Sequence, residues 1–347
     1  GIINGTGAIE AGIGHSVKAL EGKEKIIIPI TMIIFSIGGA TIGLAESELI
    51  FIPIGVALAR GLGFDAIIGM AMVNIGATVG FAGGALNPFT VGVAQGIAGL
   101  PIFSGMGYRI IGQIVLLVIS IWYVIRYSIK IKEDPRNSLV YETELKNKEI
   151  QGKEVPEFTK RLKGAMLVLV AGFVFIIYGV IKGWSTSEDL ASIFLLMGIV
   201  AGFVGGSSAN KIANDFVEGA KSVTFGALVV GISRGIVVVL EQGQIIDTII
   251  YGASSILTIF PTYISAALMF FIQVFINFFI NSGSGQAATT MPIMAPLADV
   301  VGVTRQTSVL AFQYGDGLSN SIFPTSGILM AGLSIADIPY EKWLKWV

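Results

Sequence analysis

The chain has 347 residues, of which 53% are hydrophobic and 13% are charged, and its formal net charge at pH 7 is −1. Soluble domains carry about 25% charged residues, so this composition excludes an ordinary soluble domain and indicates a membrane protein. The near-neutral charge gives no indication of nucleic-acid binding, and the absence of cysteine excludes disulfides and thiolate metal sites.

Residues 1–25 mix polar and apolar side chains and end in a cluster of lysines. This pattern predicts an amphipathic helix at the membrane surface. The segment contains His15, the single histidine of the chain, which we expect at the interface. A single histidine without partner residues gives no basis for predicting a catalytic centre.

A re-entrant hairpin is predicted next. Residues 26–37 and 49–59 are apolar, but each run is only about 11 to 12 residues long, whereas a membrane-crossing helix needs about 20. A polar, glycine-rich tip at residues 38–48 joins the two runs. Lys25 and Arg60 flank the pair, so the positive-inside rule places both ends of this hairpin in the cytoplasm.

Three further segments complete the first half of the chain. Residues 64–96 form a predicted helix that the glycine-rich stretch 80–88 interrupts, and residues 108–127 form a predicted full span. Residues 126–163 carry ten Lys or Arg and seven Asp or Glu, which are too many charges for a membrane segment. We expect this stretch to be a solvated cytoplasmic linker.

The second half repeats this order after several added segments. The elements expected there are spans at 162–181 and 191–205, a polar turn at 210–215, a weaker span at 222–240, a surface segment at 245–259, a hairpin with arms 262–280 and 287–301, a helix at 307–333 that is interrupted at 315–326, and an amphipathic end at 335–347. Each half thus contains a hairpin followed by a broken helix.

The two halves also align in sequence. Pro53-Ile-Gly-Val-Ala-Leu-Ala59 matches Pro292-Ile-Met-Ala-Pro-Leu-Ala298 at its Pro, Ile, Leu and final Ala, and the same offset pairs Gly76 with Gly315. The charges and the span count give the two hairpins opposite orientations, which is the inverted-repeat design of many transporters. The predicted fold class is therefore an all-α membrane protein, an inverted-repeat transporter with two re-entrant hairpins and two broken transmembrane helices.

The repeat predicts three parts of the chain. These are a first inverted repeat, a cytoplasmic linker and a second inverted repeat, at residues 1–127, 128–161 and 162–347. The first spans of the second repeat have no counterpart in the first repeat, and the last span of the first repeat has none in the second. We therefore expect that the N-terminal spans, roughly 70 residues, and the last helix are missing from this sequence.

The polar interruptions mark the expected binding site. Backbone can leave the helix at membrane depth only where protein or a water-filled cavity provides hydrogen-bond partners for its N–H and C=O groups. The candidate substrate-binding residues at the tips and breaks are Thr41, Glu46, Asn87, Thr90, Asn281, Ser282, Ser284, Asp316, Asn320 and Thr325. Oxygen ligands suit a hard cation, and the candidate sodium ligands are Gly38, Asn87, Ser282, Ser319 and Asn320. The alternative is that the small residues only allow close helix packing.

Two acidic residues stand apart from the other charges. Glu46 at the first tip and Asp316 at the second break lie in apolar surroundings, where an acid is costly and is a functional candidate. Either one is expected to bind a cation, carry a coupling proton or pair with the amino group of a solute. Glu48 is a weaker candidate, because we expect it to face the interface. The alternative is a structural pairing with Arg109 or Arg234.

Four segments resemble those of a known family: Asn4-Gly-Thr-Gly-Ala-Ile-Glu10, Gly80-Phe-Ala-Gly-Gly-Ala-Leu-Asn-Pro-Phe-Thr90, Ser282-Gly-Ser-Gly-Gln-Ala287 and Phe312-Gln-Tyr-Gly-Asp-Gly-Leu-Ser-Asn320. Over nearly its whole length the chain resembles the YfcC-like family of C4-dicarboxylate anaerobic carriers, in the wider ion transporter superfamily. The resemblance implies a bacterial inner-membrane carrier, often dimeric, with an elevator motion. Better-known superfamily members carry Ser-Asn-Thr at both tips, where this chain has Gly38-Gly-Ala-Thr41 and Asn281-Ser-Gly-Ser284.

The predicted function is secondary active transport of a small carboxylate-bearing solute, in exchange or in symport with sodium or a proton. Two acids without Lys or Arg in the expected core favour a solute with a positive charge, such as an amino acid, over a dianion. The resemblance implies a C4-dicarboxylate by the family's label, and a basic amino acid or arginine–ornithine exchange by some of its members. A coupled C4-dicarboxylate carrier and a channel are the alternatives. An intramembrane hydrolase with Ser284 as nucleophile is disfavoured, because His15 is distant in sequence. The expected partners are the lipid membrane, the solute and a second copy of the chain.

Overall fold

The computed structural model describes residues 2–8, 11, 24–44, 46–150, 159–181, 187–221, 238–239, 242–245, 248, 252 and 255–347. Within these ranges the chain forms helices and turns and contains no strand, which confirms the predicted all-α class. Most of the predicted surface segment at 1–25, including His15, and almost all of the weak span at 222–240 lie outside the described residues, as do seven of the fifteen residues at 245–259.

The first predicted hairpin corresponds to α3 (Glu24–Ile42), the 3-10 helix η1 (Glu46–Ile50) and α4 (Ile52–Gly61). Both α3 and α4 pack along α5 (Ala66–Gly83). Close contact depends on glycine, because a Cβ at Gly80 would lie 1.9 Å from the Ser36 carbonyl oxygen. α3 is longer than expected and runs through Gly38 to Ile42. The tip therefore begins after Ile42, which corrects the expected start at Gly38.

The first broken helix has its break later than predicted. α5 continues to Gly83 and ends at Gly84, which adopts left-handed φ of 55°. The chain resumes in a π-helical turn, η2 (Pro88–Gly92), and in α6 (Val93–Ile97). α7 (Met106–Glu133) follows and confirms the predicted full span. Its Ile114, Val118 and Trp122 are exposed, as lipid contact requires.

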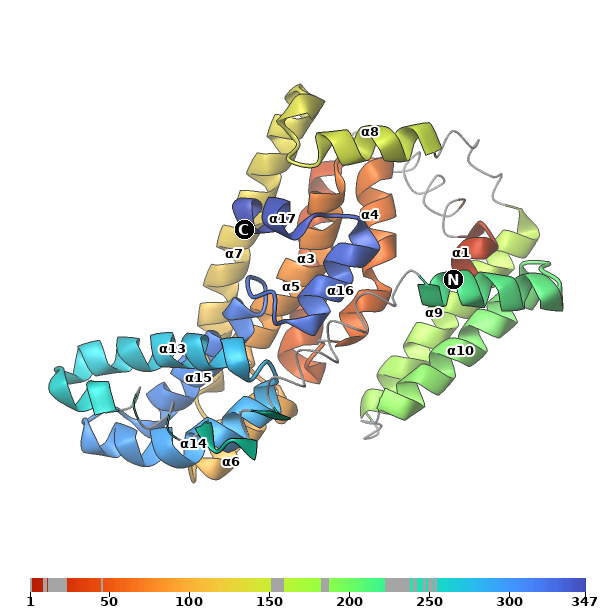
Figure 1. Cartoon of the computed structure of the whole chain (residues 1–347). Coiled ribbons are helices and arrows are strands. Elements are labelled where there is room, and N and C mark those ends of the chain that lie inside the picture. The colour runs from red at the N-terminus through yellow and green to blue at the C-terminus, as the bar shows by residue number, and fades with distance from the viewer. Residues whose placement is uncertain are drawn as a thin grey trace.

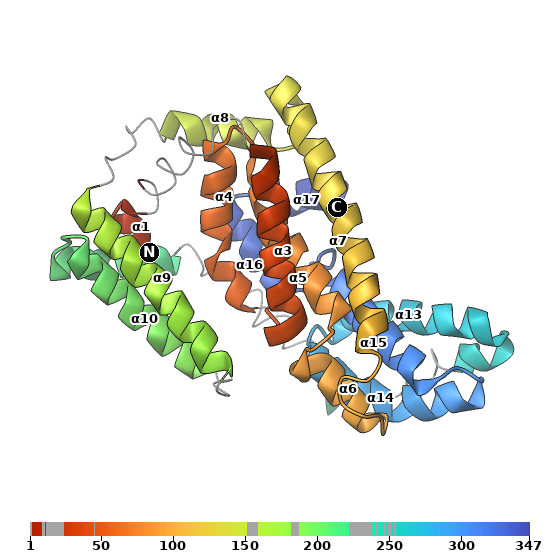
Figure 2. The ribbon, with the colours of Figure 1, turned by 180° about the vertical axis from the view of Figure 1, so that it is seen from behind.

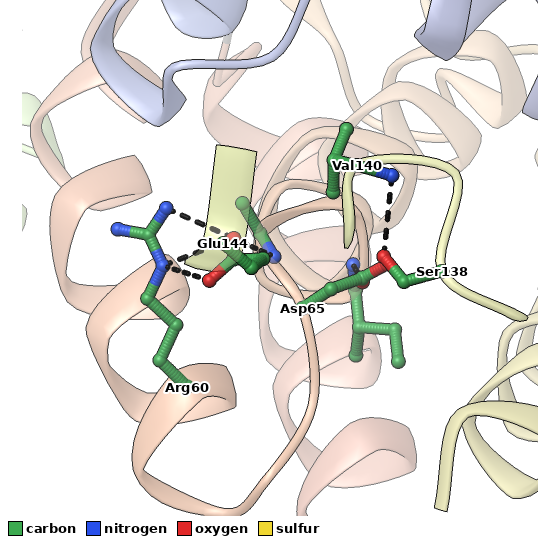
Figure 3. A network of polar contacts seen from close by, with 7 residues as sticks. Arg60, Asp65, Ser138, Val140 and Glu144 are labelled. Atoms are coloured by element: carbon green, nitrogen blue, oxygen red, sulfur yellow. Dashed lines mark hydrogen bonds and ion pairs between the residues drawn. The ribbon is translucent and has the colours of Figure 1, made fainter. Parts of the chain in front are cut away.

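The predicted linker contains ordered structure that its composition did not indicate. α7 extends to Glu133, and η3 (Pro135–Asn137) and α8 (Tyr141–Ile150) follow. Figure 3 shows Glu144 of α8 facing Arg60 at the end of α4, with 2.9 Å between its Oε2 and the Arg60 Nε. Glu144 Oε1 also accepts a hydrogen bond from the Ala66 N–H. The expectation of a plain solvated loop is therefore wrong for residues 135–150.

Asp65 makes a second set of hydrogen bonds at the same junction (Figure 3). Its Oδ1 accepts a hydrogen bond from the Ile68 N–H and so begins α5. Its Oδ2 accepts from the hydroxyls of Ser138, at 2.6 Å, and Tyr127, at 2.9 Å. The junction between α4 and α5 is thereby tied to α7 and to the chain that leads into α8.

α9 (Lys160–Ile181) and α10 (Ser187–Val204) match the first two spans predicted for the second half. They pack on each other, α1 (Ile2–Gly5) packs on α10, and a small apolar core of Ala8, Ala11, Leu162, Ala165 and Ala201 lies among them. Both views show this group beside the remaining helices (Figures 1 and 2). The polar turn predicted at 210–215 is wrong, because residues 209–221 are helical.

The second predicted hairpin corresponds to α13 (Thr262–Phe279) and α14 (Gly283–Val300), which both pack on α15 (Arg305–Ser319). The 3-10 helix η4 (Ile256–Ile259) precedes this hairpin, and α16 (Gly327–Ala336) and α17 (Tyr340–Trp346) end the chain. The break in the second broken helix is confined to residues 320–326, so the predicted start at Gly315 is corrected. Asp316 consequently lies inside a helix.

The two halves interlock around their broken helices. α5 packs on α15, α14 packs on α6, and α16 packs on α4, so each hairpin contacts the broken helix of the other half (Figures 1 and 2). Among the described residues, the helices long and apolar enough to cross a membrane span 66–97, 106–133 and 262–279. This arrangement brings both breaks and both tips into the same region of the protein.

Candidate functional site

The tip of the first hairpin meets the break that follows α5. Asn87 holds the chain in this break, since its Oδ1 accepts hydrogen bonds from the N–H groups of Phe89, at 3.0 Å, and Thr90, at 3.3 Å. Gly43 of the tip lies against the same side chain, because a Cβ there would stand 3.2 Å from Asn87 Oδ1. The tip of the first hairpin and the break after α5 therefore lie against each other around the Asn87 side chain.

The first turn of α14 approaches this location from the second half. A Cβ at Gly283 would lie 2.5 Å from Thr90 Cγ2 and 2.9 Å from Asp316 Oδ2. Glycine is thus required for the start of α14 to contact both α15 and the turn that follows the break after α5. The N-terminal end of a helix carries free N–H groups and a positive dipole end, so α14 presents a favourable field to a carboxylate here.

Asp316 is the most unusual residue of the site. Its side chain is fully buried, and neither carboxylate oxygen has a hydrogen-bond partner among the described residues. Asn320 lies close to the carboxylate without meeting hydrogen-bonding geometry. The predicted alternative partner Arg109 instead donates a long hydrogen bond, 3.4 Å, to Gln306 Oε1, and Arg234 lies outside the described residues. An uncompensated buried acid is strongly unfavourable, so Asp316 is a candidate for binding a cation or a proton.

Two further polar atoms, in the break after α5 and in the turn that follows it, lack partners among the described residues. Asn87 and Thr90 are buried, and neither Asn87 Nδ2 nor Thr90 Oγ1 forms a hydrogen bond within the part of the chain that the structure describes. An unsatisfied buried polar group costs about 1–3 kcal/mol. A cluster of such groups from two halves of the protein is what a ligand-binding site requires, because the ligand supplies the missing partners.

Asn320 is held in place by the second hairpin. Its Oδ1 accepts hydrogen bonds from Asn277 Nδ2, at 2.8 Å, and from Asn281 Nδ2, at 2.7 Å. Asn277 also donates to Ser319 Oγ, at 2.7 Å. Three of these residues, Asn281, Ser319 and Asn320, are predicted site residues, and the structure brings them together. Asn281 bonds Asn320 directly, whereas Ser319 is bonded to Asn277, the other donor to Asn320.

A pocket lies next to this cluster, between the first hairpin, α5 and the second broken helix. Its lining residues are Leu44, Glu48, Asn74, Thr78, Phe81, Gly317, Asn320, Ser326, Ile328 and Leu329. Glu48 is 3% exposed, and its Oε1 accepts a hydrogen bond of 2.6 Å from Asn74 Nδ2. The expectation that Glu48 faces the interface is therefore wrong. Glu46 belongs to η1, but its side chain is not among those described.

The remaining predicted residues lie at the margin of the site. Gly38 and Thr41 are helical residues of α3, and the Thr41 hydroxyl donates to the Ile37 carbonyl within that helix. Ser282 and Ser284, at the start of α14, are exposed. Thr325 is half-buried, and its Oγ1 lacks a partner among the described residues.

Sequence reasoning missed several buried amides that support these elements. Gln286 Nε2 donates to Gln273 Oε1, at 2.7 Å, and Gln273 donates to Thr290, which joins α13 to α14. Gln313 Nε2 donates to the Phe81 carbonyl just before the break in the first broken helix. The signal available in the sequence is an isolated Asn or Gln within an apolar helix, since such a group must find a partner in the protein.

Comparison with known proteins identifies close relatives. The family model described as C4-dicarboxylate anaerobic carrier matches residues 1–347. The Escherichia coli (strain K12) protein named "Putative basic amino acid antiporter YfcC" is 38% identical over 99% of this chain and 71% of its own length. An uncharacterized protein of Haemophilus influenzae is 33% identical over 100% of the chain and 69% of its own length.

A solved structure also shows similarity to the chain. Its title names MtrF of Neisseria gonorrhoeae and a class of antimetabolite efflux pumps. The match covers 100% of this chain and 77% of the other, with 18% sequence identity and a TM-score of 0.39. At this level of similarity we draw no conclusion from it.

Proposed function

Because the chain belongs to the C4-dicarboxylate anaerobic carrier family, whose members are membrane transporters and not enzymes, we propose that it is a secondary active transporter of the elevator type. The proposed location is the bacterial inner membrane, and the proposed assembly is a homodimer. The small-molecule solute is proposed to bind where the two broken helices and the two hairpins meet. The following paragraphs give the observations that support each part.

An inverted repeat accounts for the packing of the two halves. α3, α4, α5 and α6 correspond in order to α13, α14, α15 and α16, and the cross-contacts of α14 with α6 and of α4 with α16 are equivalent under this pairing. Such repeats bind their solutes at the repeat interface, near the bilayer midplane. The group of α1, α9 and α10, which has its own apolar core, is the proposed scaffold against which the hairpins move.

The solute that the site favours is an amino acid. The observation that carries this proposal is the fully buried Asp316 carboxylate, which has no hydrogen-bond partner among the described residues. No Lys or Arg is among the residues assigned to the site above, so the ammonium group of the solute is the proposed partner of Asp316. The solute carboxylate is proposed to bind the free N–H groups at the start of α14. A relative named as a basic amino acid antiporter supports arginine and ornithine as the first candidates.

A C4-dicarboxylate is the second candidate, and the family description supports it. Helix N-termini can bind a dianion without Arg, with sodium or a proton as the coupling ion. In that case Gly38, Asn87, Ser282, Ser319 and Asn320 are the proposed sodium ligands, and Asp316 binds the proton or the metal ion.

The experiment uses the full-length protein in liposomes, with arginine, ornithine, alanine, succinate and fumarate tested with and without sodium. Thermal stabilisation follows ligand concentration over its dissociation constant. We expect stabilisation by arginine or ornithine and exchange of the same solutes across the liposome membrane. A sodium-dependent shift with succinate alone would support the dicarboxylate candidate, and uptake that needs neither a counter-solute nor a sodium or proton gradient would support a channel.

Asp316→Asn provides the decisive variant. We expect it to remain folded, because it removes an unpaired buried acid, and to lose both the ligand-induced shift and transport. Asp299→Asn is the matched control, since Asp299 is an exposed acid of α14 that pairs with Arg305. Normal transport by Asp316→Asn would remove Asp316 from the site.

A further inference from the structure

The packing around Asp316 leaves no space for a second molecule in this conformation. Its side chain is 0% exposed, and both carboxylate oxygens are buried without a hydrogen-bond partner among the described residues. The first turn of α14 covers the carboxylate, since a Cβ at Gly283 would lie only 2.9 Å from Asp316 Oδ2. An ammonium group is about the size of a water molecule, so a solute reaches Asp316 only after α14 has moved away from α15.

The carboxylate nevertheless requires a partner in this closed arrangement, because an unpaired buried charge is strongly unfavourable. A sodium ion needs space of its own and a shell of several oxygen ligands. A proton needs neither, since it binds covalently to one carboxylate oxygen and makes the group neutral. The neutral acid is therefore the form of Asp316 that this packing accommodates.

The helices packed against α15 bring few other charges to this location. By sequence, α5, η2 and α6 contain no charged or titratable side chain. α13 contains only Tyr263, which is 76% exposed, and α14 contains only Asp299, which is exposed and pairs with Arg305. Neither helix therefore supplies a charged partner for Asp316.

The charged and titratable groups on the remaining neighbours are engaged elsewhere. Tyr314 of α15 faces α7, since a Cβ at Gly112 would lie 2.0 Å from its Oη. Arg109 of α7 donates to Gln306 at the start of α15, and Glu48 of η1 accepts a hydrogen bond from α5. Within the described part of the chain, none of these groups forms a hydrogen bond with the buried carboxylate of α15.

One carboxylate cannot bind a proton and pair with an ammonium group at the same time. We propose that the ammonium group of the solute displaces a proton from Asp316, so that the protein exchanges the solute for a proton; this inference rests on the function proposed above. The O–H bond of the Asp316 carboxyl group breaks, its proton passes to water, and the resulting carboxylate pairs with the ammonium group. The solute keeps its own protons throughout.

The same charge explains why the exchange is obligatory. A charged Asp316 without a partner is strongly unfavourable inside the membrane. The hairpins therefore cross the membrane with either the proton or the solute bound, and they do not cross with the site charged and empty. No additional gate is needed to couple the two movements.

The first test counts the protons released when purified full-length protein binds arginine. Calorimetric titration in phosphate and in imidazole buffer at the same pH gives this number, because the two buffers differ in their heat of protonation. We expect release of about one proton per arginine near pH 6 and of fewer as the pH rises. The affinity should increase with pH by at most about tenfold per pH unit, since arginine itself keeps its charges in this range.

A second test assigns the proton to Asp316 and needs no ligand. Loss of the proton with rising pH leaves an unpaired buried charge in the wild type, whereas Asp316→Asn stays neutral. We therefore expect the melting temperature of the wild type to fall relative to Asp316→Asn between about pH 6 and pH 8. A constant difference would overturn the inference.

Two control variants should release the same number of protons as the wild type. Asp299→Asn removes the exposed acid of α14 that pairs with Arg305. His15→Gln removes the single histidine of the chain, a residue type that titrates near neutral pH. Loss of proton release in His15→Gln would assign the proton to His15 and overturn the role of Asp316.

The outcomes separate this inference from the proposed function. If arginine binds to the wild type without proton release, amino-acid transport stands and exchange for a proton is overturned. In liposomes, an acidic interior should drive arginine uptake, and equal uptake without a pH gradient or counter-solute would also overturn it. Binding of succinate with uptake of a proton, and no binding of arginine, would overturn the function on which the inference rests.

Discussion

At Gly283, the absence of a Cβ allows the helices of the site to come into contact. Because a side chain there would meet Thr90 and Asp316 at 2.5 and 2.9 Å, the first turn of α14 can approach the other half only with glycine. The sequence contains many glycines, and the pattern alone does not separate those at close contacts from those at turns. At the residue scale, the functional meaning of a glycine is decided by what lies opposite to it.

We predict that Gly283→Ala separates α14 from Asp316 and Thr90. The substitution should lower the free energy of unfolding by about 1–3 kcal/mol, as overpacking does, and should abolish ligand-induced stabilisation. Thermal unfolding with and without arginine measures both effects. Gly107→Ala is the control, because a Cβ at Gly107 meets nothing within 4 Å. Normal ligand binding by Gly283→Ala would contradict the proposed contact.

Asp65 gives a prediction about pH. Burial raises the pKa of Asp65 above its ordinary value, although the hydrogen bonds from Ser138, Ile68 and Tyr127 oppose this rise. A carboxyl group with a raised pKa in the folded state favours folding below its unfolded pKa, about 3.9, and loses this contribution as the pH rises through the folded pKa. The melting temperature of the wild type relative to Asp65→Asn should therefore fall as the pH increases from about 4. A difference that is constant with pH would show that Asp65 does not titrate in this way.

At the scale of elements, α8 connects parts that the sequence keeps apart. Glu144 contacts both Arg60 at the end of α4 and the backbone of Ala66 at the start of α5. Asp65 ties the same junction to Ser138 and Tyr127. α8 is thereby attached to the first hairpin and its broken helix, and in an elevator motion it would move with them.

We predict that Glu144→Gln loosens this attachment. Loss of a partly buried, charge-assisted pair should lower the free energy of unfolding by about 1.5–3 kcal/mol. Hydrogen exchange should increase in α8 and in the first turn of α5, and proteolysis of the linker should become faster. Glu142→Gln, on the exposed side of the same helix, should change the unfolding free energy by less than about 0.5 kcal/mol. Equal exchange rates in the two variants would argue against the attachment.

At the scale of the whole molecule, the proposed inverted repeat requires the two hairpins to open to opposite sides of the membrane. The chain has no cysteine, so single cysteines can be introduced and labelled without interference from this region. Val300, at the end of α14, and Arg136, next to α7, are both exposed. They provide one reporter for each proposed side.

We predict that a membrane-impermeant maleimide labels Val300→Cys in intact cells and labels Arg136→Cys only after the cells are opened. This result follows from a cytoplasmic linker and an outward-opening second hairpin. The labelled fraction, read by gel shift, is the measurement, and a denatured sample gives the maximum. Labelling of both positions from the same side would exclude the inverted orientation of the two hairpins.

The sequence by itself determined the class of protein and most of its elements. Apolar segment length and charge density indicate membrane helices, and Gly, Pro and Asn act on the local backbone, so the breaks near Asn87 and Asn320 could be predicted to within a few residues. Segment ends were less accurate, as at Gly38 and Gly315, because packing extended α3 and α15 beyond their local signals. The isolated acid Asp316 was also recognisable, since charge is rare in such segments.

Only the tertiary structure decided which polar groups face each other. Asp316, Thr90 and Gly283 meet through contacts between helices that are far apart in the chain. The burial of Glu48 against Asn74 depends on how η1 packs on α5, so neighbouring acids of one tip could not be distinguished beforehand. Backbone preferences act over a few residues, so the local sequence is enough to predict them. The convergence of side chains depends on long-range packing, to which every contacting helix contributes.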